Sequence, residues 1–301
     1  MDRLESMSVI VAVAETGSLS AASRKLGRPI PTVSRKLSEL EARLNAQLFH
    51  RSSRQMTLTD AGRSYIEACK RIIDQVDDAE REVSGEYVAP KGDLTVTAPW
   101  GFGHMHLLPV ACEFLVAYPK IALRLVLSDR VLNPLEQKID VAIRIGNLPD
   151  SSMIANRIGS IRIVACASPT YLAAHGRPEE PCDLCNHDCI TIDDFATPRV
   201  WKFAKGKGEI AAPIRSRLTV NTSEAAVEAA VAGAGIARVM SYKMEAARRA
   251  GALVIMLEDF EQEPLPVHIV YPERKPTPLK LRAFLNWVTP RFKARLTDRV
   301  D

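Results

Sequence analysis

The chain has 301 residues, of which 47% are hydrophobic and 25% charged, and its formal net charge is +4. This size predicts two or three folded domains. No run of 18 apolar residues occurs, which excludes a transmembrane helix and a membrane partner, and Glu15 with its amphipathic surroundings argues against a secretory signal. Six unevenly spaced cysteines then indicate a reducing, cytoplasmic location.

The segment 18–56 is predicted to form two short helices around a tight turn, followed by a basic hairpin. Gly27 suits the end of the first helix, and Pro31 suits the first turn of the second. The apolar stripe of the second helix consists of Val33, Leu37, Leu40 and Leu44. Its opposite face carries Thr32, Ser34, Arg35, Lys36 and Ser38. Hydroxyl groups and long cations on one face are what a helix needs to read a DNA major groove.

Charge favours the same interpretation. Between Arg24 and Arg54 there are eight Lys or Arg residues against two acids, a local net charge of +6. The positive charge of the chain is therefore concentrated around the predicted helix-turn-helix, as in DNA-binding proteins. A solvated basic surface on an ordinary helical hairpin remains the alternative.

The motifs AASRKL, PTVSRKLSELEARL, LF-x-R at 48–51 and TLTDAG resemble the winged helix-turn-helix of the LysR-type transcriptional regulators. The resemblance implies a wing that reaches phosphates or the minor groove. The predicted DNA-binding residues are Ser18, Thr32, Ser34, Arg35, Lys36, Ser38, Arg51, Ser53 and Arg54. Pro29 and Ile30 depart from the polar pair, such as Ser-Gln, that many relatives carry here. Direct base readout is therefore expected to begin at Thr32.

We predict a DNA-binding domain over 1–58, a linker over 59–90 and an effector-binding domain over 91–301. Thr59 is expected to cap a linker helix from Asp60 to about Ser84. Its apolar stripe is Ile66, Cys69, Ile73, Val76 and Val83. This stripe requires a covering surface, either on a partner chain or on the C-terminal domain. In LysR-type regulators the helix is the dimerisation element, so the resemblance implies a homodimer or homotetramer.

From residue 93 onward, apolar strands alternate with helices, which predicts a largely parallel sheet covered on both faces. The order resembles the two-lobed α/β fold of LysR-type effector domains and periplasmic binding proteins. It is most similar to the group with TAP after the first strand and D-x-A-I-R-I-G later. The resemblance implies lobe one at 91–162 and 267–301 and lobe two at 163–266, with crossings near 161–165 and 265–267.

Ligands of open α/β sheets bind beyond the carboxyl ends of the strands. Four loops meet that condition, and the effector-binding residues predicted on them are Thr97, Pro99, Trp100, Phe102, Ser128, Arg144 and Thr222. A cation together with a helix N-terminus would suit a small carboxylate. Each residue also has a structural alternative, since Thr222 suits a helix cap, Arg144 a salt bridge and Trp100 the core.

Other candidate sites, for a metal, a redox pair or catalysis, have weaker support in the sequence. Cys182, Cys185, His187 and Cys189 are crowded and lack a second ligand pair, so neither a metal site nor a redox pair is predicted. No nucleophile elbow, cofactor signature or catalytic constellation occurs, so neither an enzyme nor a cofactor is expected. The sequence predicts a transcriptional regulator whose partners are double-stranded DNA, a small effector and RNA polymerase. A solute-binding protein of the same two-lobed fold is the alternative.

Overall fold

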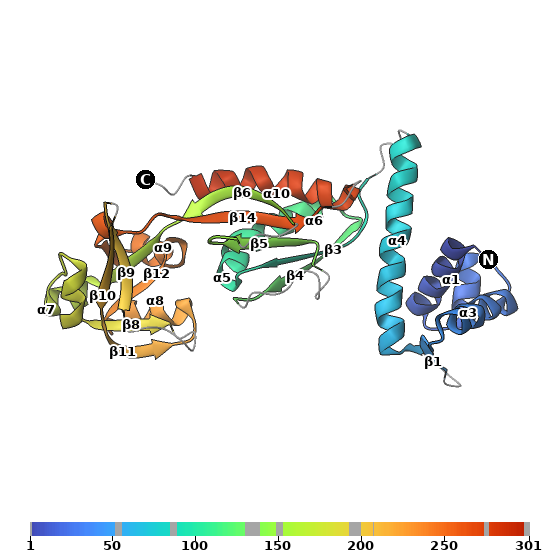
Figure 1. Cartoon of the computed structure of the whole chain (residues 1–301), viewed down its shortest axis with the longest axis horizontal. Coiled ribbons are helices and arrows are strands. Elements are labelled where there is room, and N and C mark those ends of the chain that lie inside the picture. Colours follow the sequence, from blue (N-terminus) through green and yellow to red (C-terminus); the bar gives the residue numbers. More distant parts are fainter. Residues whose placement is uncertain are drawn as a thin grey trace. The chain divides into compact units, whose positions relative to one another are not determined.

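The computed structural model describes residues 2–51, 56–84, 89–129, 139–148, 153–192, 200–206, 208–273 and 277–297 (Figure 1). The chain forms two compact units. The first is Met1–Gly92 with Arg274–Lys280, and the second is Asp93–Glu273 with Leu281–Asp301. Among the described helices, none has the length and apolar character needed to cross a membrane.

The first unit contains four helices and a hairpin in its described part. They are α1 (Arg3–Thr16), α2 (Leu19–Leu26), α3 (Ile30–Leu44), β1 (Phe49–Arg51), β2 (Met56–Leu58) and α4 (Asp60–Ser84). Gly17 and Gly27 end α1 and α2 in the left-handed conformation, which glycine adopts without steric cost. The predicted stripe of α3 is largely buried, because Val33, Leu37 and Leu40 are at most 1% exposed.

Helix α4 begins where the sequence predicts, with the Thr59 hydroxyl accepting a hydrogen bond from the Gly62 amide at 2.9 Å. The apolar stripe, however, is covered differently from either expectation. Ile66 and Cys69 are 4% and 0% exposed and belong to the core that α1 and α3 form. The N-terminal half of the stripe therefore packs on its own helix-turn-helix, which removes it from any interface with a partner chain.

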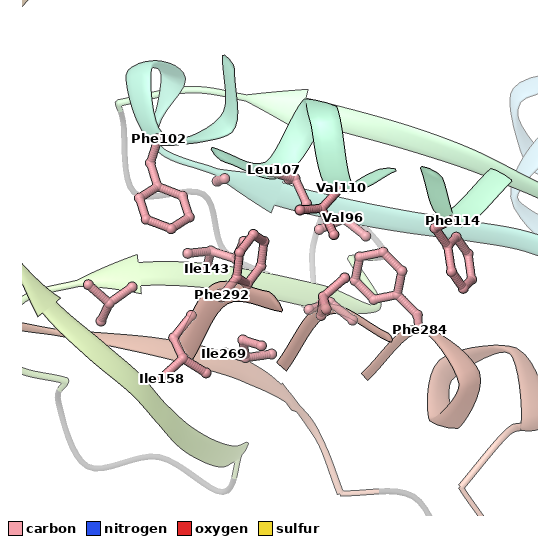
Figure 2. Packing of buried hydrophobic residues seen from close by; sticks show 14 of the residues in the cluster. Val96, Phe102, Leu107, Val110, Phe114, Ile143, Ile158, Ile269, Phe284 and Phe292 are labelled. Carbon is pink, nitrogen blue, oxygen red and sulfur yellow. The ribbon is translucent and has the colours of Figure 1, made fainter. Parts of the chain in front are cut away.

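The second unit begins with a five-stranded sheet in the order β4-β3-β5-β14-β6. Its strands are β3 (Gly92–Ala98), β4 (Ile121–Leu127), β5 (Val141–Ile145), β6 (Met153–Ile161) and β14 (Leu265–Pro272). The helical segments beside it are α5 (Trp100–Phe102), the π-helical turn η1 (Gly103–Leu107), α6 (Leu108–Ala117) and α10 (Leu279–Thr297). Side chains from these helices, Phe102, Phe114, Phe284 and Phe292 among them, fill one core against the sheet (Figure 2).

A second five-stranded sheet has the order β11-β8-β12-β7-β13. Its strands are β7 (Ile163–Ala167), β8 (Asp188–Ile192), β11 (Arg215–Val220), β12 (Ile236–Met240) and β13 (Val254–Met256). The hairpin of β9 (Val200–Lys205) and β10 (Gly208–Pro213) contributes to one buried cluster, and α8 (Ser223–Val231) and α9 (Ser241–Arg249) contribute to another. The remaining segments are α7 (Pro169–His175) and the 3-10 turns η2 (Pro181–Asn186) and η3 (Glu258–Phe260).

Strands β6 and β14 join the two sheets and run antiparallel side by side, with Leu265 opposite Ile161 (Figure 1). The sheets are consequently mixed rather than largely parallel. Pairs β3–β5, β11–β8 and β12–β8 are parallel, whereas β14–β5, β14–β6, β12–β7 and β13–β7 are antiparallel. The expectation failed because the alternation of strands and helices does not fix strand direction, and both β12 and β14 run antiparallel to a neighbouring strand.

Candidate DNA-binding and effector sites

Helix α3 has a buried face, which packs on the rest of the domain, and an open face, which is at least partly exposed. Its buried side chains fix it on α1 and α2, whereas Arg35 and Ser38 are exposed and Thr32 and Ser34 are half-buried on the other side. The Arg35 side chain is 72% exposed, and its Nε lies 3.7 Å from Glu39 Oε1 in a loose intrahelical pair. Little free energy is lost when Arg35 leaves such a pair to contact a DNA phosphate or base edge.

The N-terminal end of α3 has an unusual surface. Pro29 precedes the helix and provides no side-chain cap, and its carbonyl accepts hydrogen bonds from the amides of Thr32 and Val33. Ile30 is 45% exposed, which is high for a large aliphatic residue. Ser18 does not lie on α3: it caps α2, where its hydroxyl accepts a hydrogen bond from the Ala21 amide. The first residues of α3 therefore present an apolar rather than a polar surface.

Lys36 differs from its neighbours on the open face, because it has a partner on another helix. The side chain is only 12% exposed and pairs with Glu5 of α1, which also pairs with Arg28. The hydrogen bond from Lys36, with a smaller contribution from Arg28, holds the pKa of Glu5 below its usual value. Lys36 therefore joins α3 to α1.

The hairpin after α3 is short and well anchored. Phe49 pairs with Leu58, His50 with Thr57 and Arg51 with Met56. Glu41 Oε1 accepts hydrogen bonds from the amides of Leu48 at 2.9 Å and Phe49 at 3.3 Å, so the end of α3 sets the start of β1. Of the predicted wing residues, Ser53 and Arg54 lie outside the described residues, and Arg51 is described only through its backbone.

Glu15, in the last turn of α1, connects two further helices. Its carboxylate lies 2.7 Å from Lys25 Nζ of α2 and 3.0 Å from Lys70 Nζ of α4. These two ammonium groups, Lys25 foremost, hold the pKa of Glu15 below its usual value. The linker helix is thereby tied to the helix-turn-helix by charge as well as by the shared core.

Two predicted effector-binding residues are buried and have contacts within the framework of the first lobe. The Thr97 side chain is 3% exposed, and its hydroxyl donates to the Val126 carbonyl at 2.7 Å. Phe102 is fully buried and lies edge-on to the rings of Tyr242 and Phe292 (Figure 2). Tight packing of a wholly buried ring leaves no apolar wall for a ligand.

Trp100 remains 45% exposed and stacks on His104, and Pro99 before it is half-buried. The first and second of the four predicted loops are in contact. The Trp100 amide donates to Asp129 Oδ1 at 2.9 Å, and the Ser128 amide donates to the Ala98 carbonyl. The first loop also meets the fourth, because a Cβ on Gly101 would stand 2.9 Å from Glu224 Oε1, two residues after Thr222.

The remaining predicted residues have structural partners. The Thr222 hydroxyl accepts a hydrogen bond from the Ala225 amide at 3.2 Å and caps α8. Arg144 of β5 is half-buried opposite His268 of β14, and burial lowers the pKa of its guanidinium. Lys243 beside Gly101 was not predicted, because nothing in the sequence marks α9 as a neighbour of the first lobe.

The cysteine cluster does not assemble. Cys182 and Cys185 are exposed on η2, whereas Cys189 is buried in β8. His187 Nδ1 lies 3.3 Å from the Tyr171 hydroxyl. Within the described ranges, no group of three or more His, Cys, Asp or Glu residues is arranged to hold a metal ion.

Known proteins match both units. Residues 4–63 match the model of the bacterial regulatory helix-turn-helix protein, lysR family, and residues 89–293 match that of the LysR substrate binding domain. An HTH-type transcriptional repressor of Pseudomonas aeruginosa is 33% identical over 97% of this chain and 93% of its own. The HTH-type transcriptional activator AaeR of Escherichia coli is 31% identical over 97% of this chain and 94% of its own.

Among solved structures, CrgA of Neisseria meningitidis, a LysR-type transcriptional regulator, is 30% identical with a TM-score of 0.62, covering 96% of this chain and 98% of that one. A helix-turn-helix match beside the two-lobed domain favours a regulator over a solute-binding protein. The chain therefore belongs to the LysR family of DNA-binding transcriptional regulators with an effector-binding domain, and it is not an enzyme.

Proposed function

We propose that α3 enters the major groove of a specific operator and reads it with Thr32, Ser34, Arg35 and Ser38. The observation that carries this proposal is the division of α3 into a buried apolar face and an open face with hydroxyl groups and Arg35. Ser18, at the start of α2, and the wing residues Arg51, Ser53 and Arg54 are proposed to contact the DNA backbone. Lys36 is assigned to the fold instead.

Within the family, we assign the chain to the group with the TAP and D-x-A-I-R-I-G motifs, which stand at Thr97–Pro99 and 140–146. The proposed domains are 1–58 for DNA binding, 59–90 for the linker and 91–301 for effector binding. The predicted lobes are retained, and the adjacent crossings on β6 and β14 support them.

A small effector, of which a carboxylate is the class we favour, is proposed to bind between the lobes near Pro99, Trp100, Ser128, Arg144 and Thr222. The exposed ring of Trp100 supports this site. An effector that prefers one arrangement of the lobes would shift the protein between DNA-bound states, because binding and conformation are linked.

The protein is proposed to act in the cytoplasm as a homodimer or homotetramer, since paired half-sites require paired readers. Ile73 and Val76, half-buried on α4, remain for a partner helix after Ile66 and Cys69 are covered. Val83 lies outside the described side chains. RNA polymerase is proposed as a further partner of the DNA-bound protein.

The test is duplex binding by fluorescence anisotropy across a salt series, comparing DNA from upstream of the protein's own gene with scrambled DNA. We expect a preference for the upstream duplex that persists as salt rises, because base contacts depend on salt less than phosphate contacts do. Equal and steeply salt-sensitive binding to both duplexes would contradict specific readout of this fragment.

Arg35→Ala supplies the variant and Arg124→Ala its control, because each removes one exposed arginine and Arg124 lies on β4 of the other unit. We expect Arg35→Ala to weaken binding by roughly 1–3 kcal/mol with unchanged folding, as for the loss of a base or phosphate contact. Arg124→Ala should bind as the wild type does. Equal behaviour of the two variants would remove Arg35 from the site.

A further inference from the structure

Arg238 lies on β12, under the β9–β10 hairpin of the second lobe. Its Nη2 donates to the Lys202 carbonyl at 2.7 Å and to Gln262 Oε1 at 2.9 Å. The guanidinium carbon lies 5.1 Å from the centre of the Phe203 ring. The Nε atom is buried and has no hydrogen-bond partner within the part of the chain that the structure describes. The guanidinium is therefore held firmly in place, yet one of its donors has no acceptor among these residues.

Burial lowers the pKa of Arg238, and the more distant Glu261 carboxylate offsets this only in part. Among the residues that the structure describes, no carboxylate forms a salt bridge with it, and Glu261 is already bound by Arg162 through contacts of 2.7 Å each. Arginine stays protonated in proteins, so it cannot avoid this cost by losing its proton. A half-buried cation without a counterion is expensive unless something else supplies the negative charge.

A cavity of about 300 Å³ adjoins this side chain, a volume at the lower end of the range for small-molecule sites. Its lining includes Ile192, Val200, Trp201, Lys202, Arg238 and Gln262. Lys202 Nζ lies 3.0 Å from Glu209 Oε1, so its charge is already balanced. Trp201 is 7% exposed and offers an apolar surface. The cavity thus combines a guanidinium that has no salt bridge among the described residues with an amide and apolar walls.

We propose that this cavity binds a small monocarboxylate with an apolar body, a second site distinct from the one proposed between the lobes. The carboxylate would give Arg238 the counterion and acceptor that it lacks, and the apolar body would pack on Val200 and Trp201. A single cation matches a single negative charge, which favours a monocarboxylate over a phosphate dianion. Only the ligand's role as an effector rests on the proposed function; the binding itself does not.

The experiment titrates the full-length protein with benzoate by ligand-observed NMR and uses benzamide, which has the same ring but no charge, in parallel. Gln262→Glu is the decisive variant because it places a carboxylate next to Arg238 without removing any packing. We expect saturable benzoate binding to the wild type, and binding at least about tenfold weaker for benzamide and for Gln262→Glu, the factor that 1.4 kcal/mol produces.

Arg238→Gln should lose benzoate in the same way, and its melting temperature reports whether it folds. Arg177→Gln removes an exposed arginine of the same lobe and should bind as the wild type does. Arg144→Gln reports on the site proposed between the lobes, and it distinguishes benzoate bound there from benzoate bound in this cavity.

Unchanged affinity in Gln262→Glu, equal binding of benzamide, or loss of binding only in Arg144→Gln would each overturn the inference. So would the absence of saturable binding up to about 10 mM benzoate, a concentration that detects even weak carboxylate sites. Duplex binding of the same samples keeps the two proposals separate. A protein that binds its operator but not benzoate would refute this site and leave the regulator function intact.

Discussion

Lys243 of α9 and Glu224 of α8 form an ion pair with 2.6 Å between Nζ and Oε1, although the lysine side chain is only 5% exposed. The pair packs against Gly101 of the first lobe, where a Cβ would stand 2.4 Å from Nζ and 2.5 Å from Cε. A Cβ at this position would occupy the space of the ion pair, so the end of the Lys243 side chain would have to move.

Gly101→Ala is therefore expected to destabilise the protein. The methyl group would push a buried ammonium away from its partner, at a cost of roughly 1–3 kcal/mol for a broken buried contact. Urea unfolding measures the change. Gly208→Ala is the matched control, because its Cβ would meet only the Lys205 carbonyl at an ordinary 3.5 Å. Equal stability of the two variants would mean that the lysine moves aside at no cost.

Asp188 gives the second lobe a sensitivity to acid. Its side chain is 6% exposed and pairs with Arg217 at 2.6 Å and with Arg215. Arg217 first, and then Arg215, hold the pKa of this carboxyl below its ordinary value of 3.8. A carboxyl whose pKa is lowered by folding stabilises the protein above its unfolded pKa, and this contribution disappears as pH falls through the folded value.

We accordingly expect Asp188→Asn to be less stable than the wild type at neutral pH and to approach it as pH falls below about 4. Urea midpoints across a pH series measure this. Asp259→Asn, which alters an exposed aspartate of η3, controls for the loss of one charge. Parallel curves for the wild type and Asp188→Asn at all pH values would show that the arginine pairs do not couple to folding.

Lys36 and Arg35 are adjacent in sequence but should give different phenotypes. Lys36→Ala is expected to lower the urea midpoint, because Glu5 would keep only Arg28 as a partner. It should leave the dependence of DNA affinity on salt unchanged. Arg35→Ala should instead keep the midpoint, and it should reduce the salt slope by about 1 if it loses a phosphate contact. A reduced salt dependence of DNA affinity in Lys36→Ala would show that Lys36 contacts a DNA phosphate.

Ile30 offers an apolar surface at the end of α3 that meets the DNA in the proposed complex. The methyl group of thymine is its natural counterpart in the major groove. Replacing single operator thymines with uracil should weaken wild-type binding at one position in each half-site, by about 1 kcal/mol. Ile30→Ala should be insensitive to that replacement. Ile72→Ala, at an isoleucine of α4 that is 38% exposed, should retain the wild-type response.

Thiol labelling tests the cysteines. Burial raises the pKa of Cys166 and of Cys189 to about 12, and it also raises the pKa of Cys69. These three should resist maleimide in the folded protein, because only the thiolate reacts rapidly. Cys112 and Cys185 are exposed and should be modified first, as mass spectrometry of digests can determine. Cys182 is exposed too, but desolvation and the neighbouring Asp183 and Glu180 raise its pKa, so it should follow them. Rapid labelling of Cys189 would reopen a redox or metal role for the cluster.

The helix-turn-helix was predictable because its signals are local. Apolar spacing defines α3, and glycines end α1 and α2, so the elements follow from neighbouring residues. The pairing of Lys36 was not predictable, because its partner, Glu5, lies on another helix and no pattern along α3 reveals that contact.

The second unit was less predictable. Strand β6 contains a register shift opposite Val267 and His268, so it lacks the alternation that identifies strands. The same limit applies to the sites. Phe102 looks like a ligand wall in the sequence because its partners Tyr242 and Phe292 are far away along the chain. Arg238 had a signal that went unused, since a charged residue inside the apolar strand AGIARV requires a reason.

The two contacts of Glu15 have a mechanical consequence. Ile66 and Cys69 lie in the same core, so these ion pairs and this core join the first half of α4 to the helix-turn-helix as one rigid unit. Within such a unit, α3 would not move relative to α4 when a signal reaches the linker. In the proposed dimer, a signal that arrives through the linker would instead change the angle or the separation between two such units. Regulation would then act on the geometry of the operator, with each reading head unaltered.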